Sequence, residues 1–64
     1  MQISIKAARV NKDMTQKEAA DKLGIDKKTL CSWEKQKTMP SADKIALLCS
    51  LYEVDYDNIR WTAL

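Results

Sequence analysis

The chain has 64 residues, of which 45% are hydrophobic and 31% are charged, so it forms at most one domain, near the lower size limit for a single core. One glycine, one proline and no phenylalanine argue against a sheet-rich fold, and the abundance of Ala, Leu, Lys, Glu and Gln favours helices. The sequence has no run of 18 apolar residues that could span a membrane, and its N-terminus lacks the apolar core of a signal peptide. We therefore expect a cytoplasmic protein.

The composition also argues against an enzyme. The chain has no histidine, so a general base or an activated nucleophile would have to be a carboxylate or a lysine, and no paired carboxylates stand in an apolar setting. Cys31 and Cys49 are not spaced like a zinc or redox pair, and we interpret them as reduced thiols in or near helix packing. We therefore expect no metal, no cofactor and no small-molecule ligand.

The net charge of +2 hides an uneven distribution. Residues 1–37 contain nine Lys or Arg against five Asp or Glu, whereas residues 38–64 contain two against four. A basic front half and an acidic tail indicate one surface suited to a polyanion, although solvated lysines would give the same asymmetry.

The first two predicted helices cover residues 4–12 and 16–23. Ser4 is a plausible N-cap for the first helix, and Ile5, Ala8 and Arg9 form one stripe along it. The second helix begins with a capping box and ends at a glycine in the C′ position. These boundary residues are Thr15, Glu18 and Gly24, and the inner face contains Ala19, Ala20 and Leu23.

The third predicted helix, residues 27–35, follows a turn of about three residues and is capped by Asp26. At 100° per residue, Leu30 and Trp33 share its inner face, with Glu34 beside Leu30. The opposite side contains Lys28, Ser32 and Lys35, flanked by Lys27, Thr29 and Cys31.

Pro40 interrupts the helical pattern, because proline disfavours helix at the residue before it. The longest predicted helix, residues 41–52, follows with Ser41 as its cap, and a short last helix, residues 56–60, follows Asp55. The expected buried residues in this half are Ile45, Leu48, Cys49, either Leu51 or Tyr52, Val54 and Ile59, and Trp61 is a further candidate for the core.

Two helices joined by a tight turn at Gly24 form a helix-turn-helix, whose second helix lies in the major groove of DNA. The stretch "MTQKEAADKLGIDKKTLCSWEKQKTMPSADKIALLCSLYEV" resembles the phage repressor/Cro-type, or Xre, family. The resemblance rests on Thr15–Gln16, Leu23–Gly24, Trp33–Glu34, Pro40–Ser41 and the closing "YEVDYDNI" in the family's order and spacing. It implies an all-α, five-helix, lambda-repressor-like DNA-binding domain that covers residues 1–64.

The resemblance also implies which side chains contact bases. Lys27 and Lys28 open the recognition helix, and a lysine can donate to guanine O6 and N7 or to a phosphate. We expect Lys28 and Ser32 to contact base edges, and we expect Lys27 to contact either a base or a phosphate. Cys31 either contacts a thymine methyl or is a spectator.

Contacts with the DNA backbone are implied for a larger set. Gln16 stands at a helix N-terminus, where free N–H groups favour a phosphate, and in the family this glutamine also braces the start of the recognition helix. Lys37 and Thr38 lie in the loop after that helix. The full expected set is Thr15, Gln16, Thr29, Lys35, Lys37 and Thr38.

In the family, the positions of Arg9 and Glu34 often form a partly buried salt bridge, which orients the recognition helix more than it adds net stability. The chain departs from the family pattern at three positions. Asp13 and Gln36 replace the usual helix-exit glycines, and Ala19 replaces a common leucine. We expect strained loop geometry and a thinner core from these departures.

We expect a transcriptional repressor that binds double-stranded DNA as a homodimer, because one module this small buries little surface on DNA. The candidate apolar surface for the dimer contact contains Leu51, Tyr52, Tyr56, Trp61 and Leu64. The alternatives are a protein-interaction module, such as an antitoxin or antirepressor-type adaptor, and the DNA-binding domain of a longer repressor. Lysines at the recognition-helix face argue against the adaptor, since lysine is depleted in protein–protein interfaces.

Overall fold

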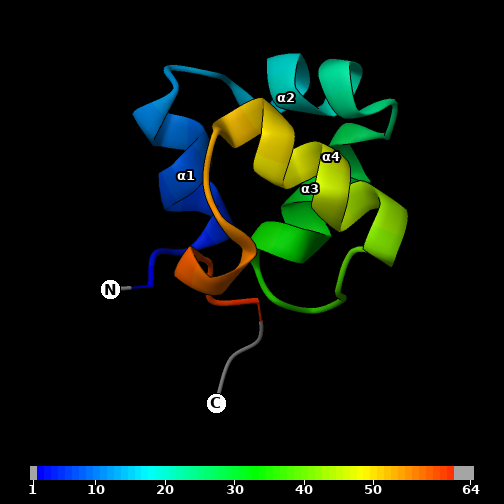
Figure 1. Cartoon of the computed structure of the whole chain (residues 1–64). Helices are drawn as coiled ribbons and strands as arrows, with labels where there is room; N and C mark the ends of the chain where they lie inside the picture. The colour runs from blue at the N-terminus through cyan, green and yellow to red at the C-terminus, as the bar shows by residue number, and fades with distance from the viewer. Residues whose placement is uncertain (1, 62–64) are drawn as a thin grey trace.

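A computed structural model describes residues 2–61 (Figure 1). It contains four α-helices and one 3-10 turn: α1 (Ile5–Asn11), α2 (Gln16–Leu23), α3 (Lys27–Glu34), α4 (Ala42–Tyr52) and η1 (Tyr56–Asn58). This arrangement confirms the all-α fold. The fifth predicted helix, residues 56–60, is shorter than expected and is a single 3-10 turn.

The chain leaves the helical conformation after η1 because its backbone pairs with the N-terminal segment. Ile3 N donates to Asn58 O at 2.8 Å and Arg60 N donates to Ile3 O at 2.9 Å, which forms a parallel bridge between Ile3 and Ile59. Ile59 is consequently extended, with φ −107° and ψ 133°, and its side chain is buried in the core. The two ends of the described chain are therefore fastened side by side.

The helix starts follow the predicted caps with two exceptions. The hydroxyls of Ser4 and Ser41 accept from backbone N–H groups three residues on, and Thr15 forms the complete capping box with Glu18. Asp26 and Asp55 occupy the N-cap positions of α3 and η1, but neither side chain makes a capping hydrogen bond. At these two starts the sequence predicts the position but not the interaction.

Between residues 2 and 61, three residues other than glycine adopt the left-handed region, namely Asp13 (φ 57°), Gln36 (φ 60°) and Glu53 (φ 54°). Asp13 and Gln36 are the positions where the family usually has glycine, so the backbone keeps the family's turns despite the substitution. Each such residue costs roughly 1 kcal/mol relative to glycine. The strain at Glu53 was not predicted; its carboxylate forms an ion pair with Lys12, which links the ends of α1 and α4.

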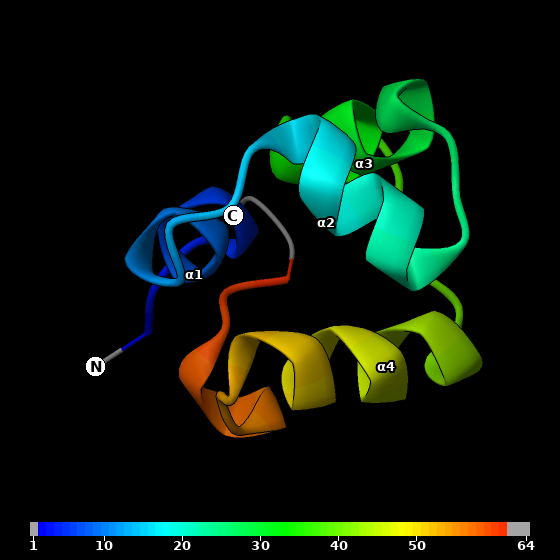
Figure 2. The same ribbon diagram turned by 90° about the horizontal axis from the view of Figure 1, so that it is seen from above.

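The core lies between the helices, with α2 and α3 on one side and α4 and η1 on the other (Figure 2). Leu30, Leu48, Tyr52 and Ile59 are the largest fully buried side chains. Tyr52 is 1% exposed and Trp61 is 8% exposed, so both belong to the core, which is one of the two places that the sequence offers for them, and they supply little open surface. Leu64 lies outside the described residues, and Ile45, Cys49 and Leu51 are only partly buried.

Within the described range, none of the helices has the length and apolar character needed to cross a bilayer.

Candidate nucleic-acid interface

The turn between α2 and α3 is fixed by its own backbone and by α4. Gly24 has φ 70°, and the N–H groups of Gly24 and Ile25 donate to the carbonyls of Asp21 and Ala20 at 3.3 and 3.0 Å. Lys44 Nζ in α4 donates to the Leu23 carbonyl at 3.0 Å, where a positive charge complements the end of the α2 dipole. Three separate hydrogen bonds therefore hold the end of α2 and the start of the turn.

The recognition helix α3 has one buried and one open side. Leu30 and Trp33 are 0% and 5% exposed and attach the helix to the core. Lys27, Lys28 and Lys35 are exposed on the remaining surface, and Lys37 is exposed in the loop that follows. Every exposed charged side chain between residues 27 and 38 is thus a lysine, whereas the exposed N-cap residue Asp26 places a negative charge at the start of the helix.

The loop after α3 is attached to the helix. The Lys37 N–H donates to the Ser32 carbonyl at 3.0 Å, and the hydroxyls of Ser32 and Thr38 share a hydrogen bond of 3.0 Å. Ser32 is partly buried rather than fully open. One of its hydrogen-bonding sites is already used, so a base contact from Ser32 would have to use the remaining capacity of the hydroxyl.

The predicted salt bridge between Arg9 and Glu34 is present and almost completely buried. Arg9 Nε donates to Glu34 Oε2 at 2.7 Å and Arg9 Nη2 donates to Glu34 Oε1 at 3.3 Å, with side chains 9% and 4% exposed. Arg9 Nη1 also donates to the Met14 carbonyl at 2.7 Å. The hydrogen bond with Glu34 raises the pKa of Arg9 above its ordinary value, so the guanidinium stays charged and neutralises the carboxylate.

The resemblance implies that Gln16 braces the start of the recognition helix, but in the structure its side chain is held at the end of that helix. Its Nε2 donates to Glu34 Oε1 at 2.9 Å, so it contacts the last residue of α3 and not the start of that helix. The carboxylate can only accept, which fixes the carboxamide with its nitrogen towards Glu34 and leaves its second N–H available. Through this contact α1, the start of α2 and the end of α3 are held by one carboxylate.

The remaining predicted residues lie around the same surface. The Thr15 hydroxyl accepts from Glu18 N at 3.1 Å, and its backbone N–H donates to Glu18 Oε1 at 2.9 Å. This backbone hydrogen bond lowers the pKa of Glu18, which keeps a negative charge in the first turn of α2. Thr29 and Cys31 are partly buried on α3. The structure therefore brings the predicted site residues onto α3, its loop and the start of α2.

Two contacts at this site were not expected from the sequence, namely that of Lys44 with Leu23 and that of Arg9 with Met14. In both contacts the acceptor is a backbone carbonyl. Every residue has such a carbonyl, so the residue type at the acceptor position gives no sign of the contact. The site contains no candidate metal cluster: among the described residues no group of three or more His, Cys, Asp or Glu side chains comes together.

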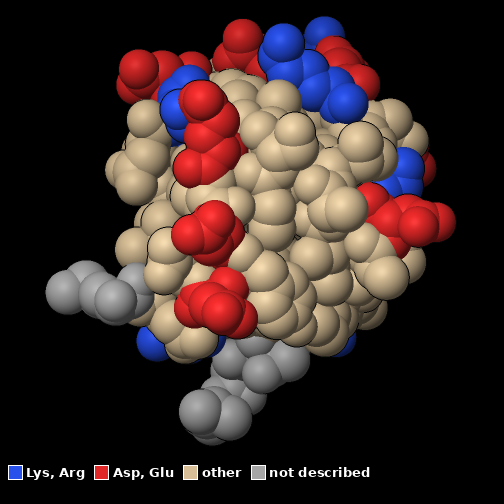
Figure 3. All heavy atoms as spheres, in the orientation of Figure 1, with Lys and Arg blue, Asp and Glu red and all other residues tan. Residues whose placement is uncertain are grey.

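The face opposite α3 has a different character. Figure 3 shows the side on which α4 lies nearest the viewer: its centre is uncharged, acidic side chains lie along its left side, and acidic and basic side chains lie together at its upper and right margins. The exposed acidic residues of α4 and its following segment are Asp43, Glu53, Asp55 and Asp57. α3, with its exposed lysines, and α4, with the acidic residues of its following segment, thus lie on opposite sides of the core.

A helix-turn-helix family model matches residues 5–59 of the chain. The match covers all four helices and η1, and the protein belongs to this family of Xre, or lambda-repressor-like, DNA-binding domains. It is a DNA-binding transcriptional regulator. No curated protein and no solved structure matches the chain.

Proposed function

We propose that this protein is a sequence-specific repressor that binds an operator in double-stranded DNA as a homodimer, as phage-type repressors do. The supporting observation is the exposed face of α3 and its loop, where every exposed charged side chain is a lysine. Glu34, the one acidic residue of α3, is buried against Arg9. The major groove accommodates one α-helix, and in a helix-turn-helix the second helix, here α3, is the one that enters it.

Within this proposal, Lys27, Lys28, Ser32 and Cys31 face the base edges. Thr15, Gln16, Thr29, Lys35, Lys37 and Thr38 contact phosphates on either side. Gln16 is held by Glu34 with one N–H unused, and the N–H groups in the first turn of α2 add donors beside it. The residues that contact phosphates thus have fixed positions, which places α3 in one register in the groove.

A dimer follows from the size of the site. A single copy offers one helix and measures 27 × 22 × 20 Å, which limits its contact with DNA to the lower end of the range for single modules. Two copies in contact are long enough to place two α3 helices one turn of DNA apart, about 34 Å. An inverted repeat is then the expected target.

A selection from a random DNA library tests this proposal, at about 0.15 M salt, where nonspecific phosphate binding is weak. We expect enrichment of an inverted repeat with half-sites one helical turn apart, and loss of enrichment for Lys28→Ala. Binding that disappears as salt rises, with no enriched sequence, would leave only general affinity for polyanions. That result would point to a protein partner for the α3 face.

A further inference from the structure

The outer side of α4 is uncharged and largely apolar, yet it is exposed in the part of the chain that the structure describes. The helix has no charged side chain from Ile45 to Tyr52, and its inner side is buried in the core. Leu47 is 50% exposed on the outer side, beside exposed Ala46 and Ser50. A helix that is apolar on both sides is ordinarily buried on both sides, so this exposed side is a candidate contact surface.

The side chains on this surface are arranged to receive a second helix. Ala46 and Ser50 are four residues apart, so they lie one turn apart on the same face, and Leu47 lies next to Ala46. Small residues allow another helix to approach closely, and a projecting leucine packs between the side chains of that helix. With 11 residues, α4 provides a contact about 16 Å long.

The charge around this surface is predominantly negative. Residues 42–59 contain four acidic residues against one lysine, a net charge of −3. The lysine is Lys44, whose ammonium already donates to a backbone carbonyl at the end of α2. Glu53 pairs with Lys12, whereas Asp43 and Asp55 form no ion pair within residues 2–61. The charge of these aspartates is therefore available to a partner.

The acidic segment after α4, residues 53–57, runs along one edge of the exposed surface. In Figure 1 the chain that leaves α4 descends on the left of the helix, and Figure 3, in the same orientation, shows acidic side chains along that side. Burial, and to a smaller extent the charge of Asp55, raises the pKa of Cys49 in α4. The Asp55 carboxylate is therefore close to the helix.

We propose that the outer side of α4 binds a basic amphipathic helix of another protein, with the apolar side of that helix over Leu47 and its Lys or Arg residues facing residues 53–57. Such a helix is complementary to the surface in shape and in charge. The negative charge disfavours nucleic acid and anionic lipid as occupants. A two-fold contact between two copies would bring acidic residues against acidic residues, so a second copy is disfavoured as well.

A partner on α4 leaves the proposed DNA-binding surface open. α3 and α4 lie on opposite sides of the core (Figure 2), so a helix packed on the outer side of α4 does not cover the lysines of α3. The chain can then hold a second protein while it is bound to DNA. This inference goes beyond the proposed repressor, and it requires neither an operator nor a dimer.

Selection of displayed peptides tests the inference. A library of helical peptides about 15 residues long, with randomised surface positions, is selected against the full chain without DNA. We expect the enriched peptides to have apolar residues at positions i, i+3, i+4 and i+7 and Lys or Arg beside them. Chemical-shift changes in the isotope-labelled chain should then map to α4 and residues 53–57.

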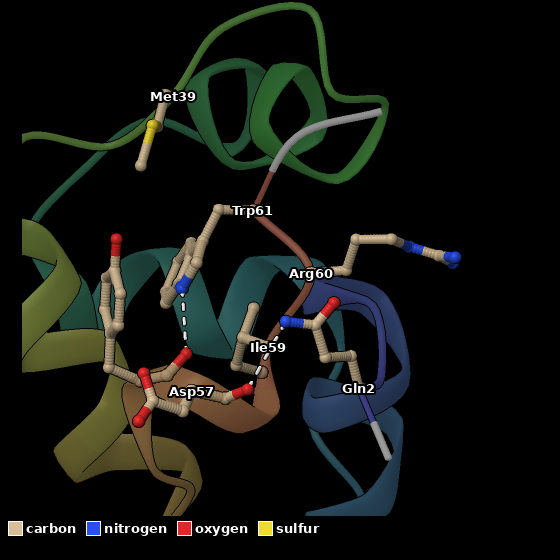
Figure 4. A pocket seen from close by; sticks show the side chains of 7 residues that line it. Gln2, Met39, Asp57, Ile59, Arg60 and Trp61 are labelled. Carbon is tan, nitrogen blue, oxygen red and sulfur yellow. Dashed lines mark hydrogen bonds between the residues drawn. The ribbon is translucent and has the colours of Figure 1, made fainter. Parts of the chain in front are cut away.

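Leu47→Asp should weaken binding of an enriched peptide at least about tenfold, because it removes the central apolar contact. The same change makes the surface more negative, so a peptide held by charge alone would bind more tightly. Met39→Asp is the matched control, because Met39 is 46% exposed and lines a separate apolar hollow with Asp57 and Arg60 at its edge (Figure 4). Its affinity should stay within about twofold of the original.

Asp55→Lys should weaken binding about threefold or more, because it reverses a charge beside the proposed helix. Asp26→Lys is its control, since both aspartates are exposed N-cap residues without a capping hydrogen bond and Asp26 lies at the start of α3. Circular dichroism confirms that each variant is folded.

Four results would each overturn the proposed surface: no enriched peptide, enriched peptides without basic residues, shift changes confined to α3 or to the hollow, and Leu47→Asp without a loss. Equal losses for Asp55→Lys and Asp26→Lys would do the same, because they would show a general effect of net charge. The peptide selection contains no DNA, so its failure is distinct from a failure of the DNA selection.

Discussion

Among single residues in the core, Tyr52 is the one whose buried hydroxyl affects how stability depends on pH. Its side chain is 1% exposed, and its hydroxyl has no hydrogen-bond partner among the described residues. Burial raises its pKa from 10.0 to about 12, with a smaller contribution from the charge of Glu34. Because the folded pKa lies above the unfolded one, the stability that the neutral phenol contributes is complete below pH 10.0 and is lost as pH rises towards about 12.

Tyr52→Phe should therefore leave the free energy of unfolding at about pH 8 unchanged or raise it by up to about 1 kcal/mol, because an unpaired buried hydroxyl is removed. It should also reduce the loss of stability at alkaline pH. Urea denaturation at both pH values measures these effects, with Tyr56→Phe at a half-exposed ring as the control. A clear loss of stability in Tyr52→Phe would show that the hydroxyl has a partner.

The buried pair of Arg9 and Glu34 is the second residue-scale feature. Glu34→Ala leaves the Arg9 guanidinium buried without its carboxylate and frees Gln16, so we expect a loss of roughly 3–5 kcal/mol in the free energy of unfolding. Glu34→Gln keeps the shape of the side chain and can still accept from Gln16, so its loss should be smaller. A melting temperature unchanged by Glu34→Ala would contradict a buried pair.

At the scale of elements, the helix exits show where the chain is strained. Gln36 adopts φ 60° directly after the C-cap of α3, and its side chain makes only one long hydrogen bond, of 3.4 Å, to the Arg60 carbonyl. Gln36→Gly should stabilise the protein by roughly 0.5–1 kcal/mol, since glycine adopts this conformation without steric cost. Thermal unfolding compares this variant with Gln36→Ala, which keeps the strain and should show no gain.

The fold at this scale followed closely from the sequence. Caps at Ser4, Thr15 and Ser41 and the left-handed Gly24 are local features, so they could be predicted from a few adjacent residues. The end of the chain was predicted less well: residues 56–60 read as a helix, yet Ile59 is extended because it pairs with Ile3 at the other end of the sequence. No local pattern contains such a long-range pairing.

For the whole molecule, the arrangement of charge governs binding to DNA. If Lys27, Lys28, Lys35 and Lys37 each neutralise one phosphate, the logarithm of affinity should fall with the logarithm of salt concentration with a slope of at most about −4 for one copy. Each Lys→Gln change in this set should reduce the slope by about 1 and weaken binding. Lys12→Gln is the control, because Lys12 is paired with Glu53 at the end of α4, and fluorescence anisotropy at several salt concentrations gives the slopes. Equal slopes for all variants would exclude α3 as the phosphate-contacting face.

The sequence by itself determined the order of the helices, the turn at Gly24, the lysines on the outer side of α3 and the partnership of Arg9 with Glu34. These features depend on local backbone preferences, on helical periodicity and on a recognisable spacing of motif residues. Only the tertiary structure decided that Gln16 contacts the end of α3, that Tyr52 and Trp61 belong to the core, and that Asp57 and Arg60 flank an apolar hollow. Each of these depends on which distant segments come to lie side by side, and burial against such segments, unlike a cap or a turn, is a property of the complete fold.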